Sequence, residues 1–450
     1  MRIYRSRPVA RAVVAAAGIS LLVSACGAGG DSGNDEGGGG DSAAEVEGDT
    51  TGVTDSTIKI GTHMPLTGPA APGYSTIPEG YQAYFEHVNA NGGVCGRDLE
   101  IVVRDDGYNP TNTTQVTNQL VLQDEIFAML GGLGTPTHSA VVDFLNEEGV
   151  PDLFVSSGSV LWKEADQNPY TFGWQSNYTV EGKIMGQYIA ENFPDAKIGL
   201  FGQGDDFGRD GFAGAKQFLE EQIVAEVTYT PGNTDVGPQM TELQQSGADL
   251  VIGFNVPAYT ALTQLAGMRL NYKPTWFYSN VGSNVGLVGA LLANFSKGAV
   301  AGAGPLEGIY TNTYIPTSDK TDNPWVQKFS EIYTESGPND EPFSDFRMYG
   351  MSQAYTLVSA LVNICDNLNR EALVKVIEEK GGDFELPLFA PMEYSEESHR
   401  GVTGVKMLQI EGGVTVDRGP VLLTDDGDGE ITEYDEEQPT PPEDGIPEEV

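Results

Sequence analysis

Basic residues are scarce in this sequence. It contains 24 Lys and Arg against 65 Asp and Glu, which gives a formal net charge of −41 at pH 7. A phosphate backbone would be repelled over the whole surface, and no basic patch with interleaved aromatic residues occurs, so nucleic acid is excluded as a partner. An acidic excess of this size is typical of a solvated surface and suggests an external medium rich in salt, where screening weakens self-repulsion.

The residue groupings of metal sites and of common catalytic sites are also missing. The four histidines lack metal-ligand spacing, and we expect them on the surface or in loops; they are His63, His87, His138 and His399. Neither a zinc motif nor a nucleophile elbow occurs. We therefore expect no metal and no cofactor, and these absences argue against an enzyme.

The first 26 residues have the pattern of an export signal. An apolar run from Ala12 to Val23 follows four arginines, Arg2, Arg5, Arg7 and Arg11. This run is shorter than the roughly 20 residues that a membrane-spanning helix needs. The next residues complete Val23-Ser24-Ala25-Cys26, which matches the lipobox recognised by bacterial lipoprotein signal peptidase. The sequence therefore predicts a signal peptide over residues 1–25 and lipidation of Cys26, with an ordinary cleavage site as the alternative.

Residues 26–53 are predicted to be a flexible, lipid-anchored linker, because they consist mainly of Gly, Ser, Asp and Glu and offer almost nothing to bury. No later segment resembles a membrane span. We therefore expect an exported protein that is held by its lipid at the outer face of the cell membrane or in the periplasm.

Two cysteines remain once Cys26 is lipidated, Cys95 and Cys365. Disulfides persist in exported proteins, so a bridge between these two is possible. Two separate buried thiols are the alternative, since the sequence does not give the distance between them.

From Thr57 onward, short β-branched runs alternate with helical stretches, which is typical of parallel sheets with crossover helices. A first series has expected strands at 57–61, 99–104, 126–130 and 152–155, and helices at 75–91, 112–122 and 139–148. A second series has strands at 197–201, 226–230, 249–254 and 275–278, and helices at 209–221, 239–245 and 259–269. Two α/β lobes in tandem are therefore predicted.

The last third of the chain departs from this alternation. Helices are expected near 325–335 and 347–366, followed by strands at 405–409 and 414–418. Residues 424–450 are acidic and rich in proline, so we expect a disordered tail there.

Function is expected at the strand ends, because ligands of open α/β sheets bind beyond the carboxyl ends of the strands. Loops rich in small and hydroxyl residues follow three expected strands, at 64–69, 131–137 and 156–159. Where such a loop opens a helix, the partial positive charge of the helix N-terminus adds to its free amides, so Thr135 and Ser157 to Ser159 could hold a carboxylate without a cation. Helix capping explains any single loop, but three loops on one rim favour a binding site.

Three motifs are more specific. Residues 58–61 lead to Pro65-Leu66-Thr67-Gly68, residues 88–94 are followed by Gly96-Arg97, and residues 204–209 read Gly-Asp-Asp-Phe-Gly-Arg. With them, the chain from about Thr57 to about Leu422 resembles the periplasmic binding proteins of the leucine/isoleucine/valine type, which are receptors of branched-chain amino-acid ABC transporters.

The resemblance implies a type I periplasmic-binding-protein fold, an α/β architecture of two lobes, each a parallel sheet flanked by helices, joined by a three-segment hinge. It assigns residues 54–175 and 305–400 to lobe 1 and residues 176–304 and 401–423 to lobe 2. The chain would cross between the lobes near Gln175, Pro305 and Arg400.

The resemblance also implies a binding site. A hydroxyl and backbone amides of lobe 1 would hold the ligand carboxylate, and lobe 2 would add an aromatic side chain. The ligand-binding residues so predicted are Thr67, Tyr74, Leu133, Gly134, Thr135, Ser157, Gly158, Ser159, Phe207 and Asn280.

Asn280 stands where amino-acid receptors carry an acidic residue for the ligand ammonium. An ammonium removed from water needs an anion or several acceptors, which Asp205 or Asp206 could supply from another direction. The ligand is therefore expected to be an amino acid, or a neutral amide, a urea-like solute or a carboxylic acid without an amine. Phe207 would present a flat apolar wall to it.

Two other motifs are weaker. Residues 202–208 resemble a dinucleotide-binding loop, but the glycine spacing is one residue too long and its aspartates would repel a pyrophosphate. Residues 424–431 resemble a calcium loop, but Thr424 stands at its first position and Asp435 at its last, which favours a solvated acidic tail.

These patterns predict the solute-binding lipoprotein of an ABC importer, which traps a small polar metabolite by hinge closure and presents it to permease subunits. The alternative is an extracellular sensing module that signals through a membrane partner.

Overall fold

The computed structural model describes residues 48–300 and 302–450. The predicted signal peptide, Cys26 and the linker up to residue 47 lie outside the described residues. Within the described part, none of the helices has the length and apolar character needed to cross a bilayer. The folded body begins earlier than the predicted linker boundary, because Asp49 forms an ion pair with Arg370 at 2.7 Å and Gly52 O accepts a hydrogen bond from Lys59 N–H.

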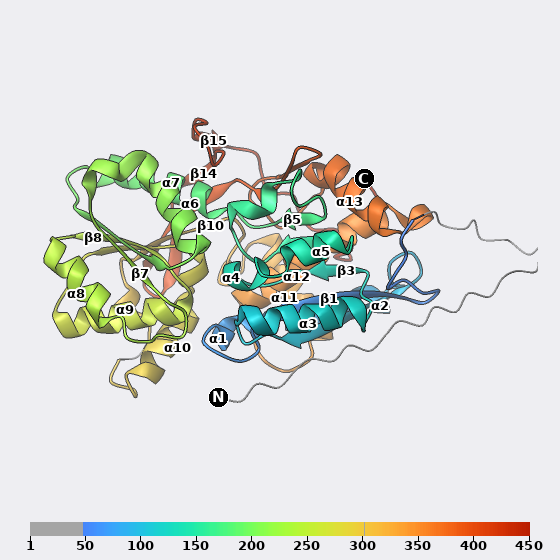
Figure 1. The fold of residues 1–450 in the computed structure, drawn as a ribbon, viewed down its shortest axis with the longest axis horizontal. Coiled ribbons are helices and arrows are strands. Elements are labelled where there is room, and N and C mark those ends of the chain that lie inside the picture. Colours follow the sequence, from blue (N-terminus) through green and yellow to red (C-terminus); the bar gives the residue numbers. More distant parts are fainter. Residues whose placement is uncertain (1–47, 301) are drawn as a thin grey trace, which may run out of the picture. The chain divides into compact units, whose positions relative to one another are not determined.

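A five-stranded parallel sheet with strand order β2-β1-β3-β4-β5 forms the core of lobe 1 (Figure 1). Its strands are β1 (Thr57–Met64), β2 (Asp98–Asp105), β3 (Ala128–Leu130), β4 (Asp152–Val155) and β5 (Thr171–Gly173). The helices between them are α1 (Ala71–Tyr74), α2 (Ile77–Ala90), α3 (Pro110–Leu122), α4 (Thr135–His138) and α5 (Val142–Glu147). The two-lobed α/β prediction is confirmed. Strands β1 to β4 overlap the four expected strands of this lobe, and β5 was not expected.

Later segments of the chain complete lobe 1. They are α11 (Pro324–Ser336), α12 (Asp345–Val362), α13 (Arg370–Lys380), β11 (Met392–Ser395) and β12 (Ser398–Val402). Helices α11 and α12 pack against α2, and β12 packs beside β5 and pairs with β11 in a two-stranded sheet. Lobe 1 is therefore built from two separate stretches of the chain.

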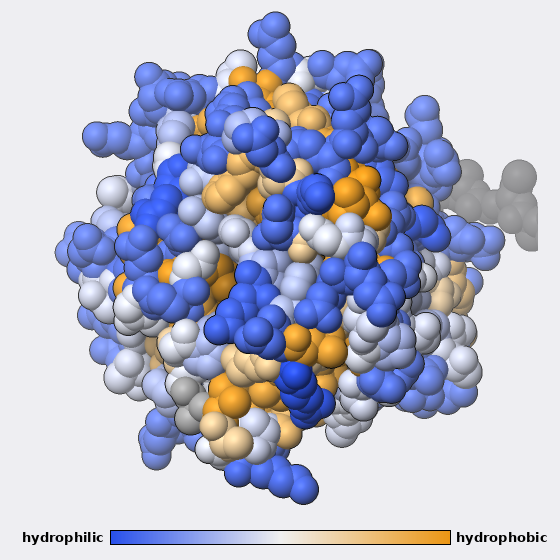
Figure 2. Space-filling view, turned by 90° about the vertical axis from the view of Figure 1, so that its left-hand side faces the viewer, coloured by the Kyte–Doolittle hydropathy of each residue, from blue (hydrophilic) through white to orange (hydrophobic). Residues whose placement is uncertain are grey.

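An eight-stranded sheet with strand order β15-β14-β13-β10-β9-β8-β6-β7 forms the core of lobe 2. Five strands are parallel: β6 (Ile198–Gln203), β7 (Ile223–Tyr229), β8 (Leu250–Phe254), β9 (Thr275–Tyr278) and β10 (Tyr310–Thr313). The antiparallel continuation is β13 (Val405–Glu411), β14 (Val414–Leu423) and β15 (Thr432–Tyr434). The face at this end of the molecule is mostly hydrophilic, with apolar side chains in separate patches (Figure 2).

The helices of lobe 2 are α6 (Tyr178–Asn192), α7 (Asp206–Leu219), α8 (Gly237–Ser246), α9 (Pro257–Leu270) and α10 (Val285–Phe295). Helices α6 and α7 lie so close that a Cβ atom at Gly182 or Gly214 would overlap the backbone of the facing helix. The sequence patterns did not predict α6, because its buried part includes Glu181 and Lys183, which interrupt the apolar periodicity.

Short 3-10 helices connect several of these elements: η1 (Val160–Lys163), η2 (Glu220–Gln222), η3 (Asn280–Gly282), η4 (Gly304–Leu306), η5 (Cys365–Asn367) and η6 (Gly381–Asp383).

The chain crosses between the sheets after β5, after β10 and between β12 and β13. The first and third crossings lie near the expected Gln175 and Arg400. The second lies after Thr313 rather than near Pro305, because β10 pairs with β9 and β13 and so belongs to lobe 2.

Residues 424–450 follow a defined path, so the expectation of a disordered tail is wrong. Strand β15 extends the sheet of lobe 2. Beyond it, Tyr84 on α2 donates a hydrogen bond to Gly445 O at 2.9 Å, and Trp325 on α11 donates one to Pro439 O. The tail is ordered although it has few apolar residues, because side chains of the folded body donate hydrogen bonds to its backbone carbonyls.

The loop that resembles a calcium site is occupied by a lysine. The ammonium of Lys183 on α6 donates to the carbonyl oxygens of Asp425, Gly427 and Gly429 at 3.2, 2.8 and 2.6 Å, and lies 3.4 Å from the Asp425 carboxylate. A side-chain cation from lobe 2 thus takes the position that a bound cation would need.

The neighbouring Asp426 carboxylate faces lobe 1. It forms an ion pair with Lys163 of η1 at 2.6 Å and lies 3.6 Å from Arg400 of β12. Since Lys183 belongs to lobe 2, this short loop, residues 424–430, is bound to both lobes.

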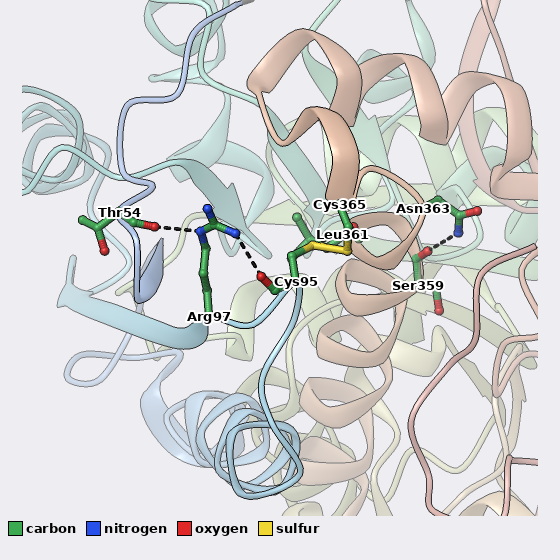
Figure 3. Close-up of a disulfide and its surroundings, with 7 residues drawn as sticks. All are labelled: Thr54, Cys95, Arg97, Ser359, Leu361, Asn363 and Cys365. Atoms are coloured by element: carbon green, nitrogen blue, oxygen red, sulfur yellow. Dashed lines mark hydrogen bonds between the residues drawn. A yellow bond between two sulfur atoms is a disulfide. The ribbon is translucent and has the colours of Figure 1, made fainter. Parts of the chain in front are cut away.

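Cys95 and Cys365 form a disulfide with a Cα–Cα distance of 5.1 Å (Figure 3). It joins the turn before β2 to the end of α12 across 270 residues of sequence. Next to it, the Arg97 guanidinium donates to the carbonyl oxygens of Thr54 and Cys95 at 2.7 and 2.9 Å. Of the two alternatives for the cysteine pair, the structure has the bridge.

Candidate ligand-binding cavity

A cavity of about 570 Å³ is lined by residues of both lobes. Lobe 1 contributes the loop after β3 and side chains of α1 and α12, and lobe 2 contributes the residues that follow β6, β8 and β9. The volume lies within the roughly 300–1,000 Å³ typical of small-molecule sites. The cavity is therefore where the strand-end argument places a ligand.

Hydrogen bonds between the lobes surround this cavity. The donor and acceptor pairs are Tyr74 Oη and Val281 O at 3.1 Å, Asn284 Nδ2 and Asp345 Oδ2 at 2.5 Å, Ser159 Oγ and Asp210 Oδ2 at 3.2 Å, and Gln203 Nε2 and Tyr108 Oη at 3.2 Å. These hydrogen bonds join the two lobes, so the structure represents a closed arrangement of the lobes.

The loop after β3 is shaped by glycine. Gly134 has a φ of 102°, and a Cβ atom there would lie 2.5 Å from both Thr137 Oγ1 and the Tyr108 ring. This turn brings Thr135 to the start of α4, where its hydroxyl lies 2.8 Å from that of Ser157. Two loops that are distant in sequence thereby form one buried hydroxyl pair.

Six of the ten predicted residues line the cavity: Tyr74, Leu133, Gly134, Thr135, Phe207 and Asn280. The other four, Thr67, Ser157, Gly158 and Ser159, are not among its lining residues. Thr67 lies in an exposed loop, where its hydroxyl donates to Asp105 at 2.7 Å. Ser159 caps η1 and donates to Asp210 of lobe 2.

Tyr178 explains why Ser157 to Ser159 are hidden. Its N–H donates to Gly158 O at 2.7 Å, and its ring packs so closely that a Cβ atom on Gly158 would lie 2.8 Å from it. The other side of the ring faces Phe207, with the two centroids 4.4 Å apart. Burial raises the pKa of Tyr178 to about 12, against the opposing effect of hydrogen bonds to Gly158 N–H, Thr135 and Ser157.

Among the lining residues that the sequence did not assign to the ligand are Tyr178, Ser156, Gln175 and Val256. Ser156 lies in the predicted hydroxyl-rich loop at 156–159, but only the later residues of that loop were predicted to bind the ligand. Gln175 and Tyr178 lie in the crossing segment after β5, which has no strand-end motif.

Asn280 lies in front of a buried carboxylate. Glu181 of α6 accepts hydrogen bonds from Asn280 N–H at 2.7 Å, from Asn312 Nδ2 at 2.8 Å and from the Ser279 hydroxyl at 3.0 Å. Burial raises the pKa of Glu181, and these hydrogen bonds act in the opposite direction. Glu181 is not a lining residue, so its acceptors are used within the protein and do not face the cavity.

Asp205, the other proposed source of negative charge, is also engaged within the protein. It caps α7 through Phe207 N–H and accepts from Gln203 Nε2 at 2.7 Å. Burial raises its pKa, and it does not line the cavity. Neither the Glu181 nor the Asp205 carboxylate is therefore available to a ligand in the cavity.

Apolar side chains contribute a large part of the lining, including Ile77, Val281, Val285, Leu287, Ile315 and Phe346. Among the described residues, the charged lining residues are Asp319, Asp345 and Arg347. Arg347 is paired with Glu79, whose carboxylate lies 2.8 Å from its Nε, and Asp345 accepts from Asn284 and Ser318.

Three of the four histidines are buried, contrary to the expectation of surface or loop positions: His63 in β1, His138 in α4 and His399 in β12. Asp106, His63, His138 and Asp152 form a hydrogen-bonded chain with distances of 2.9, 3.0 and 2.7 Å. Burial lowers the pKa of His63, while the neighbouring Asp106 raises it. Because Leu133 N–H donates to His63 O, this chain supports the loop that carries Thr135.

Comparisons with known proteins agree with this architecture. A family model described as periplasmic binding protein matches residues 57–415. Leu/Ile/Val-binding protein homolog 1 of Brucella abortus is 25% identical over 362 residues, which cover 79% of this chain and 91% of that protein.

Two solved structures show the same fold. A fatty acid ABC transporter substrate-binding protein from Thermomonospora curvata has a TM-score of 0.73 at 24% identity, covering 85% of this chain and 96% of that one. A branched chain amino acid ABC transporter protein from Thermus thermophilus with bound valine has a TM-score of 0.70 at 21% identity, covering 83% and 98%.

Proposed function

The chain belongs to the periplasmic binding protein family, of the leucine/isoleucine/valine-binding type, and from that premise we propose that it is the solute-binding component of an ABC importer. Members of this family bind and deliver solutes, and the protein is not an enzyme. The observation that carries the proposal is the cavity between the lobes, which both lobes line and which hydrogen bonds between them enclose.

The proposed mechanism is hinge closure. A solute binds the lobe 1 wall around Thr135, lobe 2 closes over it with Phe207 and Asn280, and the closed form is recognised by the permease. The three crossings after β5, after β10 and between β12 and β13 are the proposed hinge. The contacts of Tyr74 and Asn284 across the cavity would form during this movement.

The proposed ligand is a small polar metabolite, either an amino acid or a related amide, urea or carboxylate. An amino acid is supported by the Brucella relative, which is named as a Leu/Ile/Val-binding protein homolog, and by the Thermus structure, which contains bound valine. Asn280 supports the neutral members of this set, because neither Glu181 nor Asp205 lines the cavity.

The experiment is a thermal-shift screen of the mature protein against amino acids, amides, urea and small carboxylates, since a ligand that binds only the folded state raises the melting temperature. Thr135→Val should abolish the shift of any hit, because it removes the hydroxyl from the cavity wall. Thr67→Val is the matched control in an exposed loop outside the cavity. An equal loss in both variants, or in neither, would contradict the assignment of the cavity.

We also propose that the protein is anchored to the outer face of the cell membrane, or in the periplasm, through lipid on Cys26. The lipobox and the linker that follows it support this. Metabolic labelling with a fatty-acid analogue should label the wild-type protein, and Cys26→Ser should remove the label and release the protein from the membrane fraction. Labelling that persists in the variant would refute the anchor.

A further inference from the structure

The groups that would receive a ligand carboxylate are already covered by a side chain of the protein. The Tyr178 ring lies on Gly158 and against Phe207, and only 4% of the residue is exposed. The ring thus lies over Gly158, one of the residues that the sequence assigned to the ligand. A carboxylate could use this loop only if the tyrosine moved away.

The rest of the lining gives a ligand carboxylate no compensating cation. Arg347, the cationic lining residue among the described residues, is paired with Glu79. Because an unpaired charge is costly to remove from water, the cavity disfavours a ligand that carries a carboxylate.

The size and lining of the cavity add a further constraint. Leucine has nine non-hydrogen atoms, each smaller than the roughly 30 Å³ share of a water molecule, so it would fill less than half of the 570 Å³ cavity. Apolar residues such as Ile77, Leu287 and Phe346 line part of the cavity. An elongated apolar group would displace water from this surface with a gain in free energy.

We propose that Tyr178 sets the ligand class of this site: its ring covers the loop that would hold a ligand carboxylate, so the cavity accepts a predominantly apolar molecule without a carboxylate and excludes free α-amino acids. This inference rests on the proposed function, because it assumes that the cavity receives the transported solute. It narrows that function to the neutral members of the ligand set.

The test uses a pair of probes that differ only in charge, 3-phenylpropanamide and 3-phenylpropanoate, with L-leucine as a third. Titration calorimetry on the wild-type protein should show the amide binding at least about tenfold more tightly than the carboxylate, a difference of about 1.4 kcal/mol, and no binding of leucine. Tighter binding of the carboxylate or of leucine by the wild-type protein would overturn the inference, and this comparison needs no variant.

Two variants locate the effect at Tyr178. Tyr178→Ala uncovers the serine loop and should shift the amide-to-carboxylate affinity ratio toward the carboxylate by at least about tenfold. Tyr178→Phe keeps the ring over Gly158 and should retain the wild-type preference. A ratio in Tyr178→Ala equal to that of the wild type would refute the role of Tyr178 while leaving solute binding intact. If no solute of any class bound either protein, the proposed function itself would fail, and the inference with it.

Discussion

Replacing Lys183 with methionine tests whether its ammonium holds the loop at residues 424–430. The side chain is only 3% exposed, and its strongest hydrogen bonds reach Gly429 O at 2.6 Å and Gly427 O at 2.8 Å. Methionine keeps the apolar stem and fills similar space but donates no hydrogen bond. The variant therefore isolates the contribution of the charged group.

The expected loss follows from these contacts. A hydrogen bond that involves a charged group contributes about 1.5–3 kcal/mol, and part of this is recovered where water can replace the donor. Water can reach Gly427, which is exposed, and the Asp425 side chain, which is 43% exposed. We therefore expect Lys183→Met to lower the free energy of unfolding by about 3 kcal/mol, the contribution of roughly two charged hydrogen bonds.

Urea unfolding measures this change, as a lower midpoint with an unchanged slope. The matched control is Lys216→Met, because Lys216 forms a partly exposed ion pair with Glu226 on the same lobe and surface pairs contribute at most about 1 kcal/mol. A loss below about 1 kcal/mol in Lys183→Met, or an equal loss in both variants, would refute the reasoning.

Three further predictions concern other parts of the structure. Cys365→Ser should lower the free energy of unfolding by about 2–4 kcal/mol, because it removes the bridge to Cys95; reduced wild-type protein should lose a similar amount, and an unchanged urea midpoint would contradict this. Truncation after Tyr434 should lower the melting temperature, because the Tyr84 hydroxyl and the Trp325 indole lose the carbonyls they bind in the tail; a tail without structural function would leave it unchanged. Burial lowers the pKa of His63. As pH falls through the ordinary histidine pKa of about 6.5, the unfolded chain therefore takes up a proton that the folded chain does not. The free energy of unfolding should decrease over this pH range. His63→Gln should reduce this pH dependence in urea titrations, and an identical slope would show that other groups cause it.

The closed arrangement has a consequence for ligand exchange. The loop at residues 424–430 binds Lys183 of lobe 2, and its Asp426 binds Lys163 of lobe 1. The tail then continues from β15 on lobe 2 to α2 and α11 on lobe 1. Opening of the lobes must therefore either bend this segment or break some of these contacts, in addition to the three hinge crossings.

Much of the fold could be predicted from the sequence because it depends on local patterns. Short β-branched runs between amphipathic helices gave the parallel strands in the right order, and the bounds of β4 and β9 agree with the expected 152–155 and 275–278. Helix α6 and strand β10 were missed, since α6 buries charged residues and β10, with the sequence Tyr-Thr-Asn-Thr, has no run of apolar residues. Local composition could not predict the ordered tail, because its partners lie in the body of the protein.

The sequence by itself determined that hydroxyl-rich loops follow the strands of lobe 1, because strand and turn preferences act between near neighbours. Only the tertiary structure decided which of those hydroxyls face the cavity. Tyr178 covers Ser157 to Ser159 after a chain crossing, and Lys183 fills a loop 242 residues away. Contacts of this kind depend on how distant segments pack, and no local pattern in the chain specifies them.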